Sequence, residues 1–308
     1  MKIGINGSDQ LVHPELGSIV AAITQAEHDG FNSYWLAQTA LVDAQAALGL
    51  AGWQTSSITL GTAVVPTWPR HPHAMAASAL TAQAACHGRF VLGIGLSHRP
   101  VVEDRYKMEW HKPIRHMLDY LDILQPLLEN GTSDHEGEIF SFVGGGARPT
   151  PEPPKVMLAA LGEQMLRIAG SRTDGTILWC VGPTTIERQI KPVIESAASD
   201  AGRDAPSIVC SLPVWVTDDP QPARDFVGSI LATYAQLPSY RAMLDIEGVH
   251  GVEDISLIGS HDEVVDGLGR IAVAGATDFT AMVMGGNPDE LAATRGALRA
   301  AIVSGLGA

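Results

Sequence analysis

The chain of 308 residues carries a formal net charge of −14, and 45% of its residues are hydrophobic. This length suits one α/β barrel with insertions, and the hydrophobic share can fill a large core. Only 20 residues are basic against 34 acidic ones, and there is no Lys/Arg-rich run. The balance argues against nucleic acid or an anionic membrane surface as a partner.

The start of the chain carries no signal-peptide pattern, because strand-like Lys2–Asn6 follows Met1 without an apolar core region. No run of about 18 apolar residues indicates a membrane span. Cys86, Cys180 and Cys210 are odd in number, widely separated and set in apolar surroundings. We therefore expect reduced, buried thiols in a cytoplasmic protein.

Strands and helices are predicted to alternate along nearly the whole chain. Apolar, β-branched runs predict strands at 2–6, 33–37, 58–65, 89–95, 155–159, 175–180, 207–216 and 278–284. Amphipathic or Ala-rich stretches predict helices at 15–29, 43–53, 73–86, 112–129, 163–170, 184–200, 223–235, 261–274 and 289–304. This order favours a single (β/α)8 TIM barrel over residues 1–308 rather than an open Rossmann sheet, which more often has about six strands.

Two segments interrupt the alternation. The Gly- and Pro-rich segment 132–154 is predicted to form a small hairpin or lid followed by an extended linker. Segment 237–253 is less regular and is interpreted as a second insertion. We expect these two insertions to supply the walls of a substrate pocket.

The stretch 58–98 is the best-defined part of the predicted barrel. Its two strands are apolar on both faces and flank a helix, which is the pattern of a parallel βαβ unit. Unusual residues follow the strands, namely Pro66, Thr67, Trp68, Arg70 and His71 after the first, and Leu96, Ser97, His98 and Arg99 after the second. Loops at the carboxyl ends of parallel strands carry the chemistry of α/β proteins.

The same stretch resembles a known family. LGTAVVPTWPRHP, followed by GRFVLGIGLSH, is similar to the luciferase-like monooxygenase superfamily of TIM barrels, and most similar to its branch that uses coenzyme F420. The resemblance implies hydride transfer between this deazaflavin and a small organic substrate, in a homodimer. GIG is no dinucleotide fingerprint here, because His98 stands where G-x-G-x-x-G has its third Gly.

The turn after the fifth predicted strand is a candidate phosphate site. Unpaired backbone amides and the dipole at a helix N-terminus attract an anion, although an ordinary tight turn could have the same sequence. In the resembling family this turn holds the cofactor phosphate, which assigns the role to Leu161, Gly162, Glu163, Gln164 and Met165. Glu163 suits this role only if its side chain points away from the phosphate.

The third and fourth predicted strands supply candidate residues for the deazaflavin ring. The resemblance assigns a bulge behind the ring to Thr62, Ala63, Val64 and Val65. It also implies a non-prolyl cis peptide at Thr62–Ala63, and the alternative is a plain buried strand. Gly95 allows close approach of a cofactor because it has no Cβ, and Leu96 and Ser97 continue this candidate site.

His98 is the candidate general acid or base, since an imidazole titrates near neutral pH and His98 lies at the end of a barrel strand. A surface histidine is the alternative, with His71 as the reserve. Family members often read W-x-x-D-H where this chain has Gln38 and Thr39, and Gln38 can still bind the ring edge. Further pocket candidates are Asn6, Trp68 and Trp179.

The predicted function is therefore an F420-dependent oxidoreductase of unknown substrate. An FMN-dependent luciferase-like monooxygenase is the alternative among enzymes. The missing Asp-His pair favours a second alternative, a non-catalytic flavin- or deazaflavin-binding protein. No metal site is predicted, because there is no H-E-x-x-H and because His111 and His116 do not share a helix face.

Overall fold

A closed barrel of eight parallel strands forms the centre of the computed structural model, which describes residues 1–39 and 41–306. The strands in barrel order are β1 (Lys2–Asn6), β2 (Ser33–Leu36), β3 (Thr59–Thr62), β5 (Phe90–Gly95), β8 (Lys155–Leu158), β9 (Gly175–Trp179), β10 (Ser207–Val216) and β12 (Asp278–Val283). The ring closes because β12 pairs with both β1 and β10. The predicted (β/α)8 fold is confirmed.

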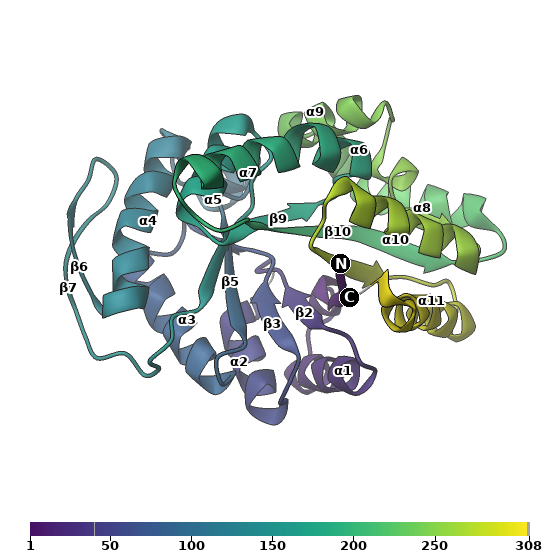
Figure 1. The fold of residues 1–308 in the computed structure, drawn as a ribbon, viewed down its shortest axis with the longest axis horizontal. Helices are drawn as coiled ribbons and strands as arrows, with labels where there is room; N and C mark the ends of the chain where they lie inside the picture. Colours follow the sequence, from purple (N-terminus) through teal and green to yellow (C-terminus); the bar gives the residue numbers. More distant parts are fainter. Residues whose placement is uncertain (40, 307–308) are drawn as a thin grey trace.

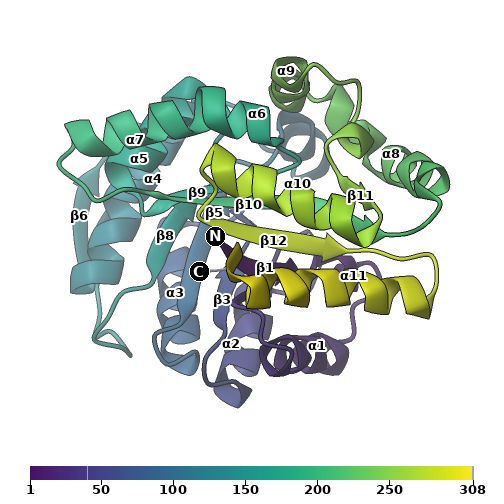
Figure 2. The ribbon, with the colours of Figure 1, turned by 45° about the vertical axis from the view of Figure 1, so that its right-hand side comes forward.

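Helices cover the outside of this barrel (Figures 1 and 2). They are α1 (Leu16–His28), α2 (Ala44–Gln54), α3 (Pro72–Ala85), α4 (Pro113–Asn130), α5 (Glu163–Arg172), α7 (Lys191–Asp200), α8 (Pro220–Gln236), α10 (His261–Ala274) and α11 (Pro288–Ala301). The start of several helices is fixed by a side-chain cap, as where Asp43 accepts from the Ala46 amide. Among the described residues, no helix combines the length and the apolar character needed to cross a membrane.

The barrel interior is filled by large side chains from alternate strand positions. Trp35, Val91, Met157, Ile177 and Val209 form one buried cluster there. Their neighbours along each strand face outward and pack under the helices, since side chains alternate across a strand. Space inside is tight, because a Cβ at Gly61 of β3 would stand 2.3 Å from the Trp35 ring.

The ladder between β3 and β5 is interrupted after Thr62. The Thr62 hydroxyl donates to the Gly93 carbonyl and accepts from the Gly93 amide, each at 2.8 Å, in place of backbone pairing. A two-residue strand, β4 (Val65–Pro66), then resumes pairing with β5. The non-prolyl cis peptide lies at Ala63–Val64, so its prediction at Thr62–Ala63 is wrong by one bond. The reason is the register, since the Ala63 amide still donates to Leu36 of β2.

The first insertion is a hairpin, as predicted. Strands β6 (Thr132–Glu136) and β7 (Ser141–Gly145) pair antiparallel and lie outside α4 (Figure 1). The buried Asp119 carboxylate of α4 accepts from the Ile139 amide at 2.7 Å and is ion-paired with Arg115. This carboxylate therefore fastens the hairpin to α4.

The second insertion is regular, which corrects the expectation for 237–253. It forms helix α9 (Pro238–Glu247), which begins with a proline and ends at left-handed Gly248. Tyr240, Met243 and Leu244 give the helix a buried stripe. Strand β11 (Leu257–Gly259) follows and pairs with the far end of β10. The short helix α6 (Pro183–Thr185) lies beside α9 in both views.

Candidate functional site

The carboxyl ends of the strands form a mouth lined mostly by small side chains. Inward-facing positions continue beyond the interior cluster, by two residues after Met157 and Val209 and by four after Val91, because side chains alternate along each strand. They bring Gly95, Ala159 and Ser211 to the mouth. A Cβ at Gly95 would lie 2.8 Å from Val64 Cγ2 and 3.1 Å from Ala159 Cβ. Glycine therefore permits the close approach of these three strands.

One buried polar pair lies in this layer. The Asn6 side chain at the end of β1 donates to the Ser211 hydroxyl at 2.9 Å, which in turn donates to the Thr280 carbonyl at 2.9 Å. The side-chain oxygen Oδ1 of Asn6 accepts from the Ser8 amide at 3.1 Å. The Asn6 side chain is thus held in one orientation at the barrel mouth, as a cofactor-binding residue there should be.

The interrupted strand places only part of its predicted set at the barrel interior. Ala63 and Val64 pack against the interior cluster, and both are half-buried. The Thr62 hydroxyl instead donates to the Gly93 carbonyl. Val65 packs in the outer core. Of these residues, Ala63 and Val64 are the two that could back a ring at the mouth.

The N-terminus of α5 is open to solvent. Gly162 is the N-cap and supplies no side chain, and no atom lies within 4 Å of the position its Cβ would take. Glu163 pairs along the helix with Arg167 at 2.8 Å. The carboxylate is therefore directed away from the end of the helix, and the first amides can receive an anion.

His98 lies against aromatic rings from two other segments. Its ring centroid is 6.1 Å from Tyr234 of α8 and 5.7 Å from Tyr240 of α9, both edge to face. Tyr234 also lies 6.2 Å from Trp179, the inward-facing residue at the end of β9. We call His98, Trp179, Tyr234 and Tyr240 the aromatic wall.

Burial sets the charge of this wall. It lowers the pKa of His98 below its ordinary value, because the imidazolium loses water there. It raises the pKa of Tyr234 and of Tyr240, because the phenolates would lose water too. The wall is consequently uncharged near neutral pH, and the His98 imidazole is deprotonated and neutral.

The strand ends beside the wall adopt an uncommon backbone conformation. Ser97, directly before His98, has a φ of 62°, and Cys180, directly after Trp179, has a φ of 54°. Left-handed residues other than glycine are uncommon and gather at functional sites. Here they set the direction in which the chain leaves β5 and β9.

Other predicted site residues are engaged elsewhere. The Gln38 side chain donates to the Val42 carbonyl and accepts from the Ala44 amide, both at 2.8 Å, so it shapes the loop before α2. His71 caps α3 by accepting from His73, and its ring packs against Phe140 of the hairpin. Neither side chain is brought to His98.

Trp68 and His116 form a stacked pair of rings at the loop after β4. Their rings stack with centroids 4.0 Å apart, and His116 Nε2 lies 2.9 Å from the Thr67 hydroxyl. Burial lowers the pKa of His116 to about 4, so the ring is neutral. Trp68 is therefore a packed residue rather than an exposed wall of the mouth.

One group of metal-ligand type occurs among the described residues. Asp119, Asp122 and His135 bring oxygen and nitrogen atoms within 4.8 Å of one another. Arg115 already neutralises Asp119, and hydrogen bonds from it and from the Ile139 amide outweigh burial and lower the pKa of Asp119 to about 2. Asp119 of this group therefore serves to fasten the hairpin to α4.

The sequence analysis missed Tyr234 and Tyr240. Both lie in or beside the segment that was interpreted as irregular. The signal was present, because Pro238 starts a run with apolar residues at Tyr240, Met243 and Leu244 and with Gly248 after its end. That pattern predicts a short amphipathic helix.

A model of the luciferase-like monooxygenase family matches residues 3–278. The chain belongs to this family. The 5,10-methylenetetrahydromethanopterin reductase of Archaeoglobus fulgidus is 26% identical over 313 residues, covering 91% of this chain and 93% of that protein. The family prediction is confirmed.

Solved structures agree on the fold. The coenzyme F420-dependent tetrahydromethanopterin reductase of Methanopyrus kandleri has a TM-score of 0.74 at 20% identity, covering 97% of this chain and 96% of that one. The FMN-bound oxygenating constituent of 3,6-diketocamphane monooxygenase from Pseudomonas putida has a TM-score of 0.78 at 16% identity, covering 98% and 96%. This relative and these two solved structures are named as reductases or a monooxygenase, and the two structures use F420 and FMN respectively by their names.

Proposed function

We propose that this protein is an oxidoreductase that binds coenzyme F420 and transfers hydride between the deazaflavin and a small organic substrate. The observation that carries the proposal is the open N-terminus of α5, three residues beyond the small-residue mouth at Ala159. A flat ring and an anionic group need this combination of small side chains along part of the mouth and unpaired amides.

The residues present fit such a cofactor. The amides at Glu163 and Gln164 would hold a phosphate, with the Glu163 side chain kept aside by Arg167. Ala63 and Val64 would back the ring. A bound deazaflavin supplies the hydride chemistry. The chain itself supplies Asn6 as a fixed hydrogen-bonding group, and His98 to hold or release a proton at its ring nitrogen.

F420 is favoured over FMN by the two motifs around β3 and β5 and by the name of a more similar relative. A putative coenzyme F420-dependent oxidoreductase is 26% identical over 286 residues. The FMN-binding neighbour above shares only 16% of its sequence. An FMN-dependent monooxygenase remains the second candidate, and turnover with reduced cofactor separates either enzyme from a binding protein.

The decisive experiment is a titration of F420 and FMN side by side. We expect F420 to bind with a Kd of about 1 μM or tighter, near −8 kcal/mol, and FMN at least ~10-fold more weakly. Protein that purifies with stoichiometric FMN would overturn the cofactor assignment.

A pair of variants tests the phosphate site itself. Gly162 has extended backbone angles that any residue can adopt, so Gly162→Asp adds an N-cap carboxylate without strain. We expect Gly162→Asp to weaken F420 binding at least ~10-fold and to leave thermal stability equal or higher. Gly162→Asn is the matched control, because it adds a similar cap without charge. Equal F420 affinity in Gly162→Asp and Gly162→Asn would show that the phosphate binds elsewhere.

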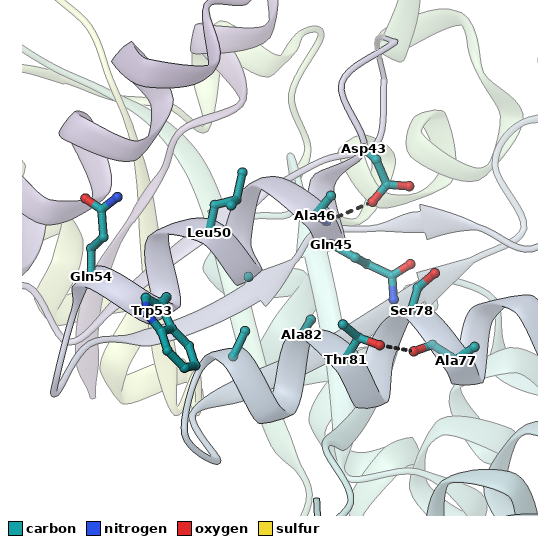
Figure 3. A pocket seen from close by; sticks show the side chains of 12 residues that line it. Asp43, Gln45, Ala46, Leu50, Trp53, Gln54, Ala77, Ser78, Thr81 and Ala82 are labelled. Carbon is teal, nitrogen blue, oxygen red and sulfur yellow. Dashed lines mark hydrogen bonds between the residues drawn. The ribbon is translucent and has the colours of Figure 1, made fainter. Parts of the chain in front are cut away.

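We also propose that the protein is a cytoplasmic homodimer that associates through α2 and α3. A groove of about 800 Å3 runs along their outer faces (Figure 3). Small residues such as Gly49 and Ala82 line it, while Leu50 and Trp53 project with 50% and 71% of their surface exposed. Small residues beside exposed apolar ones suit close helix packing between two copies. The three free, buried cysteines suit a reducing compartment.

A further inference from the structure

We infer that the substrate of this site is an uncharged, planar molecule, aromatic or conjugated, that packs against the aromatic wall. The inference rests on the proposed function, since it names the class of substrate for the same site. Three observations carry it: the direction of Trp179, the arrangement of the rings and the state of the nearby charges.

Trp179 directs the wall into the mouth. It lies two residues beyond Ile177, which belongs to the interior cluster, and alternation along β9 turns both side chains to the same face. The indole is half-buried, as are His98 and Tyr234, so each ring keeps accessible surface. Tyr240 is buried behind them. The wall therefore offers aromatic surface where a substrate would meet a cofactor.

The rings are arranged to accept another ring. Trp179 and Tyr234 meet at 73°, Tyr234 and Tyr240 at 72° with centroids 5.0 Å apart, and His98 and Tyr234 at 86°. Edge-to-face contacts leave ring faces that are not covered by a parallel neighbour. A planar substrate can stack on such a face or meet its edge, and each contact contributes about 0.5–1.5 kcal/mol beyond burial.

The cation next to His98 in the chain is already paired, because Arg99 binds Glu103 at 3.0 Å. The wall itself is uncharged near neutral pH, with its histidine in the basic form. A phosphorylated or carboxylated substrate would lose water against the wall without gaining a cation from any of its four residues. The site therefore selects for an uncharged molecule.

The wall is also held in place. The Glu247 carboxylate of α9 accepts from the Thr185 amide at 2.6 Å and from the Thr184 amide at 3.3 Å. The Thr185 hydroxyl donates back to the Met243 carbonyl at 3.1 Å. These bonds tie α9, and with it Tyr240, to the segment that follows β9. A wall fixed before binding loses less entropy when a ring docks.

Calorimetric titration of the full chain with three matched probes tests the inference. The probes are 2-naphthol, decahydro-2-naphthol, which is not planar, and 2-naphthyl phosphate, which is charged. We expect 2-naphthol to bind at least ~10-fold more tightly than either of the others. Equal affinity for the two alcohols, tighter binding of the phosphate, or no binding of 2-naphthol would each overturn the inference.

Three variants assign the effect to the wall. We expect Tyr234→Leu to reduce the preference for 2-naphthol to about threefold or less, and Tyr234→Phe, which keeps the ring, to retain it. Phe226→Leu is the matched control, because Phe226 lies on the same helix with 49% of its surface exposed. Melting temperatures confirm that each variant folds. A full preference in folded Tyr234→Leu would overturn the role of the wall.

These measurements are separable from the test of the proposed function. The probes are titrated without added cofactor, whereas the cofactor titration uses no probe. A preference for 2-naphthol in protein that binds neither F420 nor FMN would support the aromatic site and remove the proposed oxidoreductase. Tight F420 binding without that preference would remove only the substrate class.

Discussion

At the scale of single residues, His98 combines position and chemistry. It follows β5 at the mouth of the barrel, and burial lowers its pKa, so the neutral imidazole predominates near pH 7. We expect His98→Ala to lower kcat by about 10²–10⁴-fold and to change F420 affinity by less than ~10-fold. Steady-state kinetics and a cofactor titration measure the two effects separately.

The pH profile adds a second readout for His98. If its neutral form acts as the base, the rate rises with pH through the lowered pKa and is level above about 6.5. The rising part of the pH–rate profile should be absent in His98→Gln. His111→Ala is the control, because His111 is exposed in the same loop. Turnover within a few-fold of wild type in His98→Ala would remove the catalytic role.

The Glu27 carboxylate stabilises the fold by accepting hydrogen bonds from the backbone before β3. Burial disfavours its charge, but hydrogen bonds from the Ser57, Ile58 and Ser56 amides outweigh that cost and lower its pKa from 4.5 to about 2. A depressed folded-state pKa adds stability above pH 4.5, and this stability is lost as the pH falls toward 2.

We expect Glu27→Gln to cost about 1–3 kcal/mol of unfolding free energy at pH 7, and less at pH 3, since the wild type loses its advantage there. Urea unfolding at pH 7, 4.5 and 3 measures this difference. Glu129→Gln, at an exposed position, is the control. A cost that does not depend on pH would mean that the charge of Glu27 contributes nothing.

At the scale of elements, α9 depends on one carboxylate. Glu247 accepts two amides at the start of α6, and a Cβ at Gly182 would lie 2.6 Å from its Cδ. We expect Glu247→Ala to cost about 1–3 kcal/mol, because the amides lose their acceptor, and Glu247→Gln to cost less. Hydrogen exchange should accelerate in α9 but not in α1. Unchanged exchange in α9 would show that packing alone holds this helix.

At the scale of the whole molecule, a charge placed in the outer groove tests the proposed dimer. Trp53→Glu puts a charge on the projecting indole position of α2 and should shift a dimer to a monomer, as measured by sedimentation equilibrium. Leu291→Glu is the matched control, since Leu291 is 40% exposed on α11. A dimer that persists in Trp53→Glu would locate the interface on another face.

The barrel was predictable from the amino-acid order, because strand and helix periodicity are local properties of the chain. The family was predictable from the two motifs around β3 and β5, and so was the uncapped turn at Gly162. These features depend on residues close together in the chain, so a linear reading is sufficient to find them.

Which side chains are available to a ligand depends on contacts between distant parts of the chain. Thr62 is used to complete the ladder to β5, which moves the cis peptide to Ala63–Val64, and Gln38 is used by its own loop. Tyr234 contacts His98 although the two residues are 136 positions apart in the chain. Such a contact is set by closure of the barrel and by the docking of α8, which no local pattern encodes.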